Sequence, residues 1–254
     1  MRITLLQTDI HWGDNTANQQ KAEQMMDAEA GSELYILPEM WNTGFDTSDR
    51  IRPLLSYGSD ALEWMRKNAR ERNCAIAGSM AIMEEGRIFN RLYLVKPDGS
   101  AVHYDKRHLF GIGGEDRTFT AGHGRTVCEL NGWRILLLTC YDLRFPVFAR
   151  NRNDYDMMIC VASWPESRQA VWQTLLKARA IENQCVVCGV NRTGRDPLCH
   201  YAGGSVIIDA YGRELLNLGD AENAGTAKTD LHSLQTFRRK FPVLKDADAF
   251  TLKD

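Results

Sequence analysis

The sequence predicts an α/β protein in which strands and helices pack in layers. Short apolar runs alternate with helix-length amphipathic segments along the chain, which is the pattern of this class. Two of the runs, residues 133–139 and 157–162, are nearly continuous, as in strands that are buried on both faces. With 254 residues, 44% of them hydrophobic, the chain can form a sizeable core. It has no internal repeat, linker or low-complexity segment, so we expect a single domain over residues 1–254.

The N-terminal part of the chain shows clear strand and helix signals. Residues 2–8 and 34–37 are short apolar runs, which are typical of strands. Between them, the segment from Asn15 to Gly31 carries a narrow apolar stripe and is predicted to be a helix. Asn15 is a favoured residue at a helix start, and Gly31 is a favoured one just past a helix end.

A second helix is predicted from the segment after Ser59 to about Asn73. Asp60 and Glu63 have the spacing of a capping box, and apolar residues recur on one face of the segment. The chain then returns to strand-like runs, and glycine- and proline-containing turns stand at residues 97–99 and 211–212. Further strands are predicted at residues 75–81, 91–96, 133–139, 157–162, 186–190, 205–209 and 214–217.

A third helix is predicted after Ser167, and residues 227–240 are expected to end in a short fourth helix. The apolar residues of the third helix step by four, three and three positions, which indicates a helix packed on a sheet. These residues are Val171, Leu175, Ala178 and Ile181.

Charge and cysteine content bear on the partners and the compartment. A formal net charge of −2 gives no electrostatic reason to expect nucleic acid or an anionic membrane surface as a partner. No apolar stretch is long enough to span a bilayer, and residues 1–9 lack the apolar region of a signal peptide. The 7 cysteines are scattered among apolar neighbours, which favours reduced thiols over a disulfide framework. We therefore expect a cytoplasmic protein that acts on a small molecule.

Three polar side chains follow or lie near strand-like segments, where a catalytic site would form. Cys140 ends one apolar run, and Glu39 follows another run directly after a proline. Lys106 stands in a segment of mixed charges and aromatic residues. Taken singly, a cysteine is more often a packing residue, and the carboxylate and the lysine are more often solvated loop residues. Together they supply the nucleophile, carboxylate and cation that amide hydrolysis through a thioester requires.

The surroundings of these residues resemble the nitrilase superfamily of carbon–nitrogen hydrolases. The resemblance lies in residues 37–39, 104–110 and 139–146, which follow the family order and spacing. It continues through residues 162–165, 178–184, 190–192 and 205–212, and so covers nearly the whole chain. Within the superfamily, residues 106–110, 153–156, 241–242 and 246–248 are most similar to bacterial omega-amidases.

The resemblance implies a four-layer α-β-β-α sandwich, a homodimer with sheets stacked across its interface, and a Glu-Lys-Cys triad without metal or organic cofactor. By motif, Glu39 is the general base and Cys140 the nucleophile. Lys106 and the backbone N–H of Tyr141 then stabilise the oxygen that becomes negative. Residues 241–254 are expected to form a C-terminal tail at the dimer interface.

The implied reaction is that of an omega-amidase. Such an enzyme releases ammonia from the terminal amide of short 2-oxo-dicarboxylic acid monoamides, such as 2-oxoglutaramate and 2-oxosuccinamate. The matching loop, residues 113–122, implies a second glutamate near the amide or the attacking water, so Glu115 is a catalytic candidate, with an ordinary loop acid as the alternative. Phe119 of the same loop and Trp164 are expected to contact substrate, although Trp164 could equally be a core residue.

The carboxylate of an omega-amide favours a guanidinium partner, because the planar fork of arginine can bind both oxygens. Arg144, Arg117 and Arg192 are candidates for this contact, and the sequence does not rank them. For Arg144, a structural ion pair with Asp142 is favoured over direct contact with substrate.

Two other interpretations stay open at this point. Another nitrilase-family amidase, a nitrilase or an N-carbamoyl hydrolase would use the same triad on a different substrate. A non-catalytic, redox-responsive protein would use Cys185 and Cys188, but this pair has no second pair of ligands and its members fall on opposite faces of a strand. The 6 histidines show no ligand spacing, so no metal site is predicted.

Overall fold

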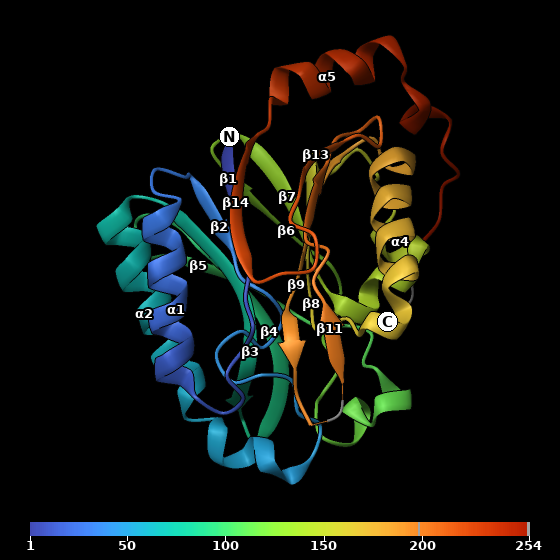
Figure 1. Ribbon diagram of the computed structural model, residues 1–254. Coiled ribbons are helices and arrows are strands. Elements are labelled where there is room, and N and C mark those ends of the chain that lie inside the picture. The colour runs from blue at the N-terminus through green and yellow to red at the C-terminus, as the bar shows by residue number, and fades with distance from the viewer. Residues whose placement is uncertain (198, 253–254) are drawn as a thin grey trace.

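The computed structural model describes residues 1–197 and 199–252 and confirms the predicted α/β fold class. Two six-stranded sheets face each other, and helices cover their outer faces, so the layers run α-β-β-α (Figure 1). The sheets meet over one apolar cluster, to which Leu5 and Leu94 contribute from the first sheet and Leu138 and Val161 from the second. This shared core fixes the position of one sheet relative to the other.

The first sheet has the strand order β14-β1-β2-β3-β4-β5. Pairing is parallel between β1 and β2 and between β2 and β3, and antiparallel between its other neighbours. The strands are β1 (Arg2–Gln7), β2 (Leu34–Ile36), β3 (Ala75–Glu84), β4 (Arg87–Val95), β5 (Ala101–Asp105) and β14 (Asn223–Lys228). Since β14 comes from the far end of the chain, this sheet is complete only when both ends have folded together.

The second sheet has the strand order β13-β12-β9-β8-β7-β6. Its central strands β7, β8 and β9 are parallel and almost wholly buried, as their continuous apolar runs predicted. The strands are β6 (Thr126–Leu130), β7 (Trp133–Thr139), β8 (Met157–Ala162), β9 (Val186–Asn191), β12 (Val206–Ile208) and β13 (Glu214–Asn217). A separate two-stranded ribbon, β10 (Thr193–Arg195) with β11 (His200–Ala202), follows β9.

Helices α1 (Asn15–Ala28) and α2 (Tyr57–Arg72) cover the outer face of the first sheet, and α4 (Gln169–Glu182) covers that of the second (Figure 1). The short α3 (Pro146–Ala149) follows the end of β7, and α5 (Leu231–Lys240) lies at one end of the sandwich. Single 3₁₀ turns connect these elements: η1 (Asp49–Leu54), η2 (Gly111–Gly113), η3 (Glu115–Arg117), η4 (Cys140–Arg144), η5 (Glu166–Arg168) and η6 (Val243–Asp246).

Helix boundaries depart from the sequence prediction by one to three residues. The side chain of Asp14, not Asn15, accepts the capping hydrogen bond of α1, from the N–H of Ala17. Helix α2 starts at Tyr57, so Asp60 and Glu63 lie within the helix and form no capping box. Its predicted end is right, because Asn73 takes the left-handed conformation that closes a helix, with φ of 50°.

The buried face of α4 is turned by about one residue from the predicted one. Trp172, Leu176 and Ala180 are fully buried against the second sheet, whereas Ile181 is 49% exposed. The indole N–H of Trp172 donates to the carbonyl of Gly204. The predicted apolar face is therefore wrong by about one residue. Trp172 and its hydrogen bond set the rotation of the helix about its axis.

Residues 250–252 pack against the body of the chain. The guanidinium of Arg152 lies 4.7 Å from the ring centroid of Phe250, and Leu252 packs against the core beside Phe145 and Phe148. Residues 253–254 of the predicted tail lie outside the described residues. None of the helices in the described part of the chain is long and apolar enough to cross a membrane.

Packing of α4 on β9 generates a stability prediction at Gly189. A Cβ at this position would lie 2.4 Å from Cδ1 of Leu176, so we expect Gly189→Ala to lower the free energy of unfolding by about 1–3 kcal/mol through overpacking. Denaturant unfolding of Gly189→Ala, Leu176→Ala and the double variant measures this. Gly189→Ala should lower the free energy of unfolding by less when Leu176 is already alanine. Strictly additive losses of unfolding free energy in the double variant would contradict the assigned contact.

Candidate active site

Cys140 stands directly after β7, where the chain enters the turn η4. Its φ is 49°, a left-handed conformation that costs an ordinary residue about 1–2 kcal/mol. The turn is held from below by Asp142, whose Oδ2 accepts from the backbone N–H of Thr139 at 3.0 Å. The strained backbone thus delivers the thiol at the carboxyl end of a buried strand.

Asp142 is a fully buried anchor for this turn. It accepts from the Tyr104 hydroxyl at 2.8 Å and from the backbone N–H of His108 at 3.0 Å, and its Oδ1 also lies 2.8 Å from Nδ1 of His108. The guanidinium of Arg144 lies instead over the ring of Trp164. The expected ion pair between Asp142 and Arg144 is therefore wrong, because the 3₁₀ turn points the two side chains at different partners.

Glu39 leaves β2 after a proline and is 1% exposed. One carboxylate oxygen accepts from Nζ of Lys106 at 2.9 Å, and the other accepts from the backbone N–H of Ser163 at 2.8 Å. Ser163 directly follows β8 of the second sheet. Glu39 therefore joins the ends of strands from both sheets.

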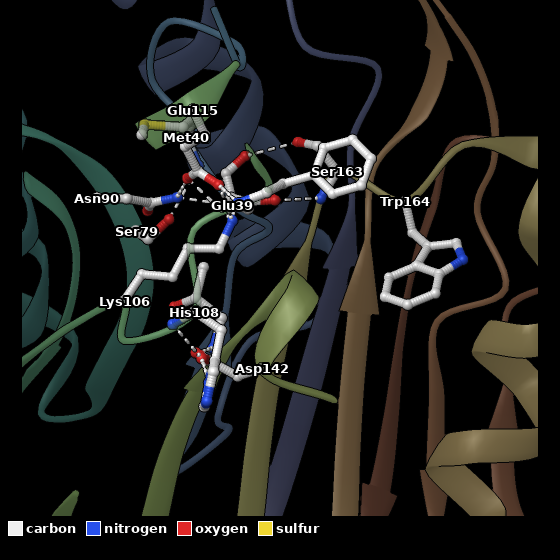
Figure 2. A network of polar contacts seen from close by, with 12 residues as sticks. Glu39, Met40, Ser79, Asn90, Lys106, His108, Glu115, Asp142, Ser163 and Trp164 are labelled. Atoms are coloured by element: carbon white, nitrogen blue, oxygen red, sulfur yellow. Dashed lines mark hydrogen bonds and ion pairs between the residues drawn. The ribbon is translucent and has the colours of Figure 1, made fainter. Parts of the chain in front are cut away.

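Lys106 follows β5 and lies between two carboxylates (Figure 2). Its ammonium donates to Glu39 at 2.9 Å and to both oxygens of Glu115 at 3.0 and 2.8 Å. The side chains of Lys106 and Glu39 are each 1% exposed, and that of Glu115 is 0% exposed. A charge this deeply buried requires such pairing, so Glu115 holds the ammonium in place.

Asn90 of β4 bridges the two carboxylates (Figure 2). Its amide nitrogen donates to Glu39 Oε1 at 2.7 Å and to Glu115 Oε1 at 3.2 Å. The residue is fully buried. Asn90 could not be recognised from the sequence, because a lone asparagine in a strand carries no motif of its own.

Burial and neighbouring charges shift the pKa values of Cys140, Lys106 and Glu115. Burial raises the pKa of the Cys140 thiol well above its ordinary range, Glu39 raises it further, and Lys106 opposes the rise. Burial alone would lower the pKa of Lys106, but Glu115 and Glu39 raise it well above its usual value. Burial raises the pKa of Glu115, against the opposing effect of Lys106. Lysine is thus held as a cation and the cysteine as a neutral thiol.

A cavity of about 130 Å³ opens above these groups. It brings together six of the residues that the sequence analysis named: Glu39, Lys106, Cys140, Tyr141, Arg144 and Trp164. Ten further residues line its wall without a role expected from the sequence: Phe45, Thr47, Phe110, Gly113, Ser163, Pro165, Arg168, Asp196, Cys199 and Tyr201. The last two come from the segment around the β10–β11 ribbon, which only the tertiary fold places here.

Four of the named candidates lie off the cavity wall. Glu115 sits behind Lys106, and Arg117 is exposed. Phe119 packs in a small apolar cluster with Met40, Ile51, Leu55, Ala81 and Ile88. Arg192 is fully buried, where it donates to Asp9 and to the carbonyl of Ile10.

In residues 1–197 and 199–252, no group of three or more His, Cys, Asp and Glu side chains is placed so that it could hold a metal ion. Cys185 and Cys188 are both buried, and burial raises the pKa of each thiol well above its ordinary value.

The sequence matches the family of carbon-nitrogen hydrolases over residues 2–239. The chain belongs to the carbon-nitrogen hydrolase family. Among curated relatives of this hydrolase, omega-amidase YafV of Escherichia coli K12 is 43% identical over 99% of this chain and 98% of its own length. The 2-oxoglutaramate amidase of Bacillus subtilis is 35% identical over 96% of each chain.

Solved structures give the same fold. XC1258 of Xanthomonas campestris, described as a CN-hydrolase superfamily protein with an arsenic adduct in its active site, superposes with a TM-score of 0.94. It is 39% identical and covers 100% of this hydrolase and 99% of its own chain. The likeness confirms the layered nitrilase-type architecture.

Loss of the Asn90 amide should impair the hydrolase through its carboxylates. The hydrogen bond from Asn90 favours the ionised form of Glu115, so its loss in Asn90→Leu should raise the pKa of that acid further and move the acid limb of the pH profile of kcat/KM to higher pH. Loss of a bond to a charged group, roughly 1.5–3 kcal/mol, should lower kcat about tenfold or more. The matched control is Asn68→Leu on α2, which removes another buried amide. Asn68→Leu should lower the free energy of unfolding without moving the acid limb of the kcat/KM profile. An acid limb that stays in place in folded Asn90→Leu would refute the role of Asn90 at the carboxylates.

The Cys140 thiol should stay protonated in the free hydrolase at neutral pH, because burial raises its pKa well above the ordinary value of a cysteine. The difference in ultraviolet thiolate absorbance between the wild type and Cys140→Ala, followed as pH rises, measures this. We expect no difference signal at neutral pH. A titration step near neutrality would instead indicate a preformed thiolate and would contradict the need for a base.

Proposed function

We propose that this hydrolase is an omega-amidase, which converts short 2-oxo-dicarboxylic acid monoamides, such as 2-oxoglutaramate and 2-oxosuccinamate, to the 2-oxo acid and ammonia. The observation that carries the proposal is the buried ammonium of Lys106, hydrogen-bonded to Glu39 and Glu115 at the wall of a cavity that Cys140 also lines. The relatives named as omega-amidase and 2-oxoglutaramate amidase support the choice of substrate.

The reaction begins with transfer of the Cys140 proton to Glu39 as the sulfur attacks the amide carbon. A base is needed because the resting thiol is neutral. The carbonyl oxygen becomes negative, and the ammonium of Lys106 and the backbone N–H of Tyr141 stabilise it, each by about 3–4 kcal/mol. Both residues line the cavity with Cys140.

The tetrahedral intermediate then collapses. The carbon–nitrogen bond breaks, Glu39 returns the proton to the leaving nitrogen, and ammonia departs from a thioester. Water next attacks the thioester carbon while Glu39 accepts a water proton; the carbon–sulfur bond breaks and the proton returns to sulfur. Glu115 keeps Lys106 in position throughout, through its hydrogen bonds of 3.0 and 2.8 Å. It acts through the lysine, since it lies off the cavity wall.

The remaining substrate contacts are assigned from the cavity wall. Tyr141 and Trp164 flank the carbon chain of the substrate, and Arg144 faces its carboxylate. Arg117 and Phe119 do not line the cavity, which argues against direct contact with substrate.

We assign the enzyme to the cytoplasm as a single-domain homodimer. Exposed apolar side chains support an interface: Ile181, Tyr211 and Phe241 are 49%, 57% and 58% exposed. The rings of Tyr211 and Phe241 both lie beside that of Phe237 of α5 at tilted angles, so the three form one aromatic patch near the start of the tail. The seven cysteines, all free thiols, suit a reducing compartment.

Ammonia release from 2-oxoglutaramate tests the function, with a simple monoamide and a nitrile as controls. The native enzyme should hydrolyse the omega-amide fastest, and Cys140→Ala should abolish turnover while it leaves the fold intact. Lys106→Met and Glu39→Gln should lose activity far more than stability. Faster hydrolysis of the nitrile or of the simple amide would move the specificity to another branch of the family, and activity in Cys140→Ala would remove the nucleophile.

A further inference from the structure

The guanidinium groups of two arginines lie over aromatic rings that line the catalytic cavity. The guanidinium carbon of Arg144 lies 5.1 Å from the ring centroid of Trp164, and that of Arg168 lies 5.3 Å from the ring centroid of Phe110. All four residues line the same cavity as Cys140. The two cations therefore border the space that the non-reacting end of a substrate would occupy.

Hydrogen bonds hold both aromatic residues beneath these guanidinium groups in place. The indole N–H of Trp164 donates to the backbone carbonyl of Arg168 at 2.9 Å, and the backbone N–H of Trp164 donates to Asn191 at 2.7 Å. On the other wall, the backbone N–H of Phe110 donates to Glu115 at 2.6 Å. The residue under Arg168 is thus hydrogen-bonded to the carboxylate that holds Lys106, and the ring under Arg144 is hydrogen-bonded to the backbone of Arg168.

Neither guanidinium forms an ion pair with a carboxylate in residues 1–197 and 199–252, unlike Arg91 with Asp105 or Arg134 with Asp156. The two acids on the cavity wall are already engaged. Glu39 accepts from Lys106 and Ser163, and Asp196 accepts from the Tyr201 hydroxyl at 2.6 Å. The cavity therefore offers two cationic forks without a protein counter-ion, which is a site for an anion.

We propose that Arg144 and Arg168 together bind the 2-oxocarboxylate end of the substrate, an assignment that rests on the proposed omega-amidase function. This end presents two carboxylate oxygens and a neighbouring ketone oxygen, all of them acceptors, to two planar forks that only donate. The same pair repels an ammonium group. It selects a 2-oxo acid amide over the corresponding amino acid amide, because an α-ammonium group would lie among cations.

The test compares kcat/KM for 2-oxoglutaramate, its methyl ester and L-glutamine in the native enzyme, Arg168→Gln and Arg144→Gln. For Arg168→Gln we expect KM for 2-oxoglutaramate to rise about tenfold or more, with kcat/KM for the uncharged ester unchanged. The preference for 2-oxoglutaramate over L-glutamine should fall in both variants. Arg168→Lys keeps the charge and loses the planar guanidinium, so its KM for 2-oxoglutaramate should lie between those of the native enzyme and Arg168→Gln.

Arg66→Gln on α2 is the matched control, because this arginine pairs with Glu63 on the surface and should leave all three values unchanged. Binding of 2-oxoglutaramate to Cys140→Ala with and without Arg168→Gln, measured by calorimetry, separates affinity from turnover. Equal affinities in the two proteins would overturn the proposal, as would an equal loss of activity on the ester and the acid.

The two proposals fail in different ways. A native enzyme that hydrolyses the ester as fast as the acid would refute the omega-amidase function itself. A native enzyme that prefers the acid, combined with an Arg168→Gln variant that keeps the full preference, would leave the function standing and refute the arginine pair.

Discussion

One buried ammonium between two buried carboxylates is the interaction on which the site depends. Lys106 contacts Glu39 and Glu115, and the three side chains are almost completely shielded from water. Charges in such a place are tolerated only when their partners lie at hydrogen-bonding distance, so small displacements are costly. Asn90 and the N–H groups of Ser163 and Phe110 satisfy further lone pairs of the two acids. The network therefore demands that three strand ends, the interior of β4 and one loop meet with little freedom.

The fold meets this demand through the apolar layer between the sheets. Glu39 and Lys106 follow strands of the first sheet, whereas Cys140 and Ser163 follow strands of the second. Nothing in the local sequence of either group sets the distance to the other. The shared core, with residues of both sheets in one cluster, sets it instead. The left-handed turn at Cys140 adds local strain that this packing supports.

The sequence predicted the features that short-range patterns encode. Buried strands such as β7 and β8 were recognisable from continuous apolar runs, and the order of motifs identified Glu39, Lys106 and Cys140 as one site. Features that depend on long-range contact were missed or misjudged. Asn90 contacts Glu39, and Arg168 lies over Phe110, only because the fold brings these remote residues together. From the sequence, Arg192 was a candidate to bind the substrate carboxylate, but in the fold its guanidinium donates to Asp9. The Asp142–Arg144 pair was expected from a strand-like alternation of side chains, and these residues form a 3₁₀ turn instead.

The division of the reacting groups between two sheets has a consequence for biosynthesis. The chain emerges from the ribosome with Glu39 and Lys106 well before the central strands of the second sheet, and β14, which closes the first sheet, comes near the end. A partial chain that lacks β14 has an incomplete first sheet, so Glu39, Lys106 and Cys140 are not yet held by the finished pair of sheets. Assembly of the site is thereby tied to completion of the fold, since its side chains follow strands of both sheets.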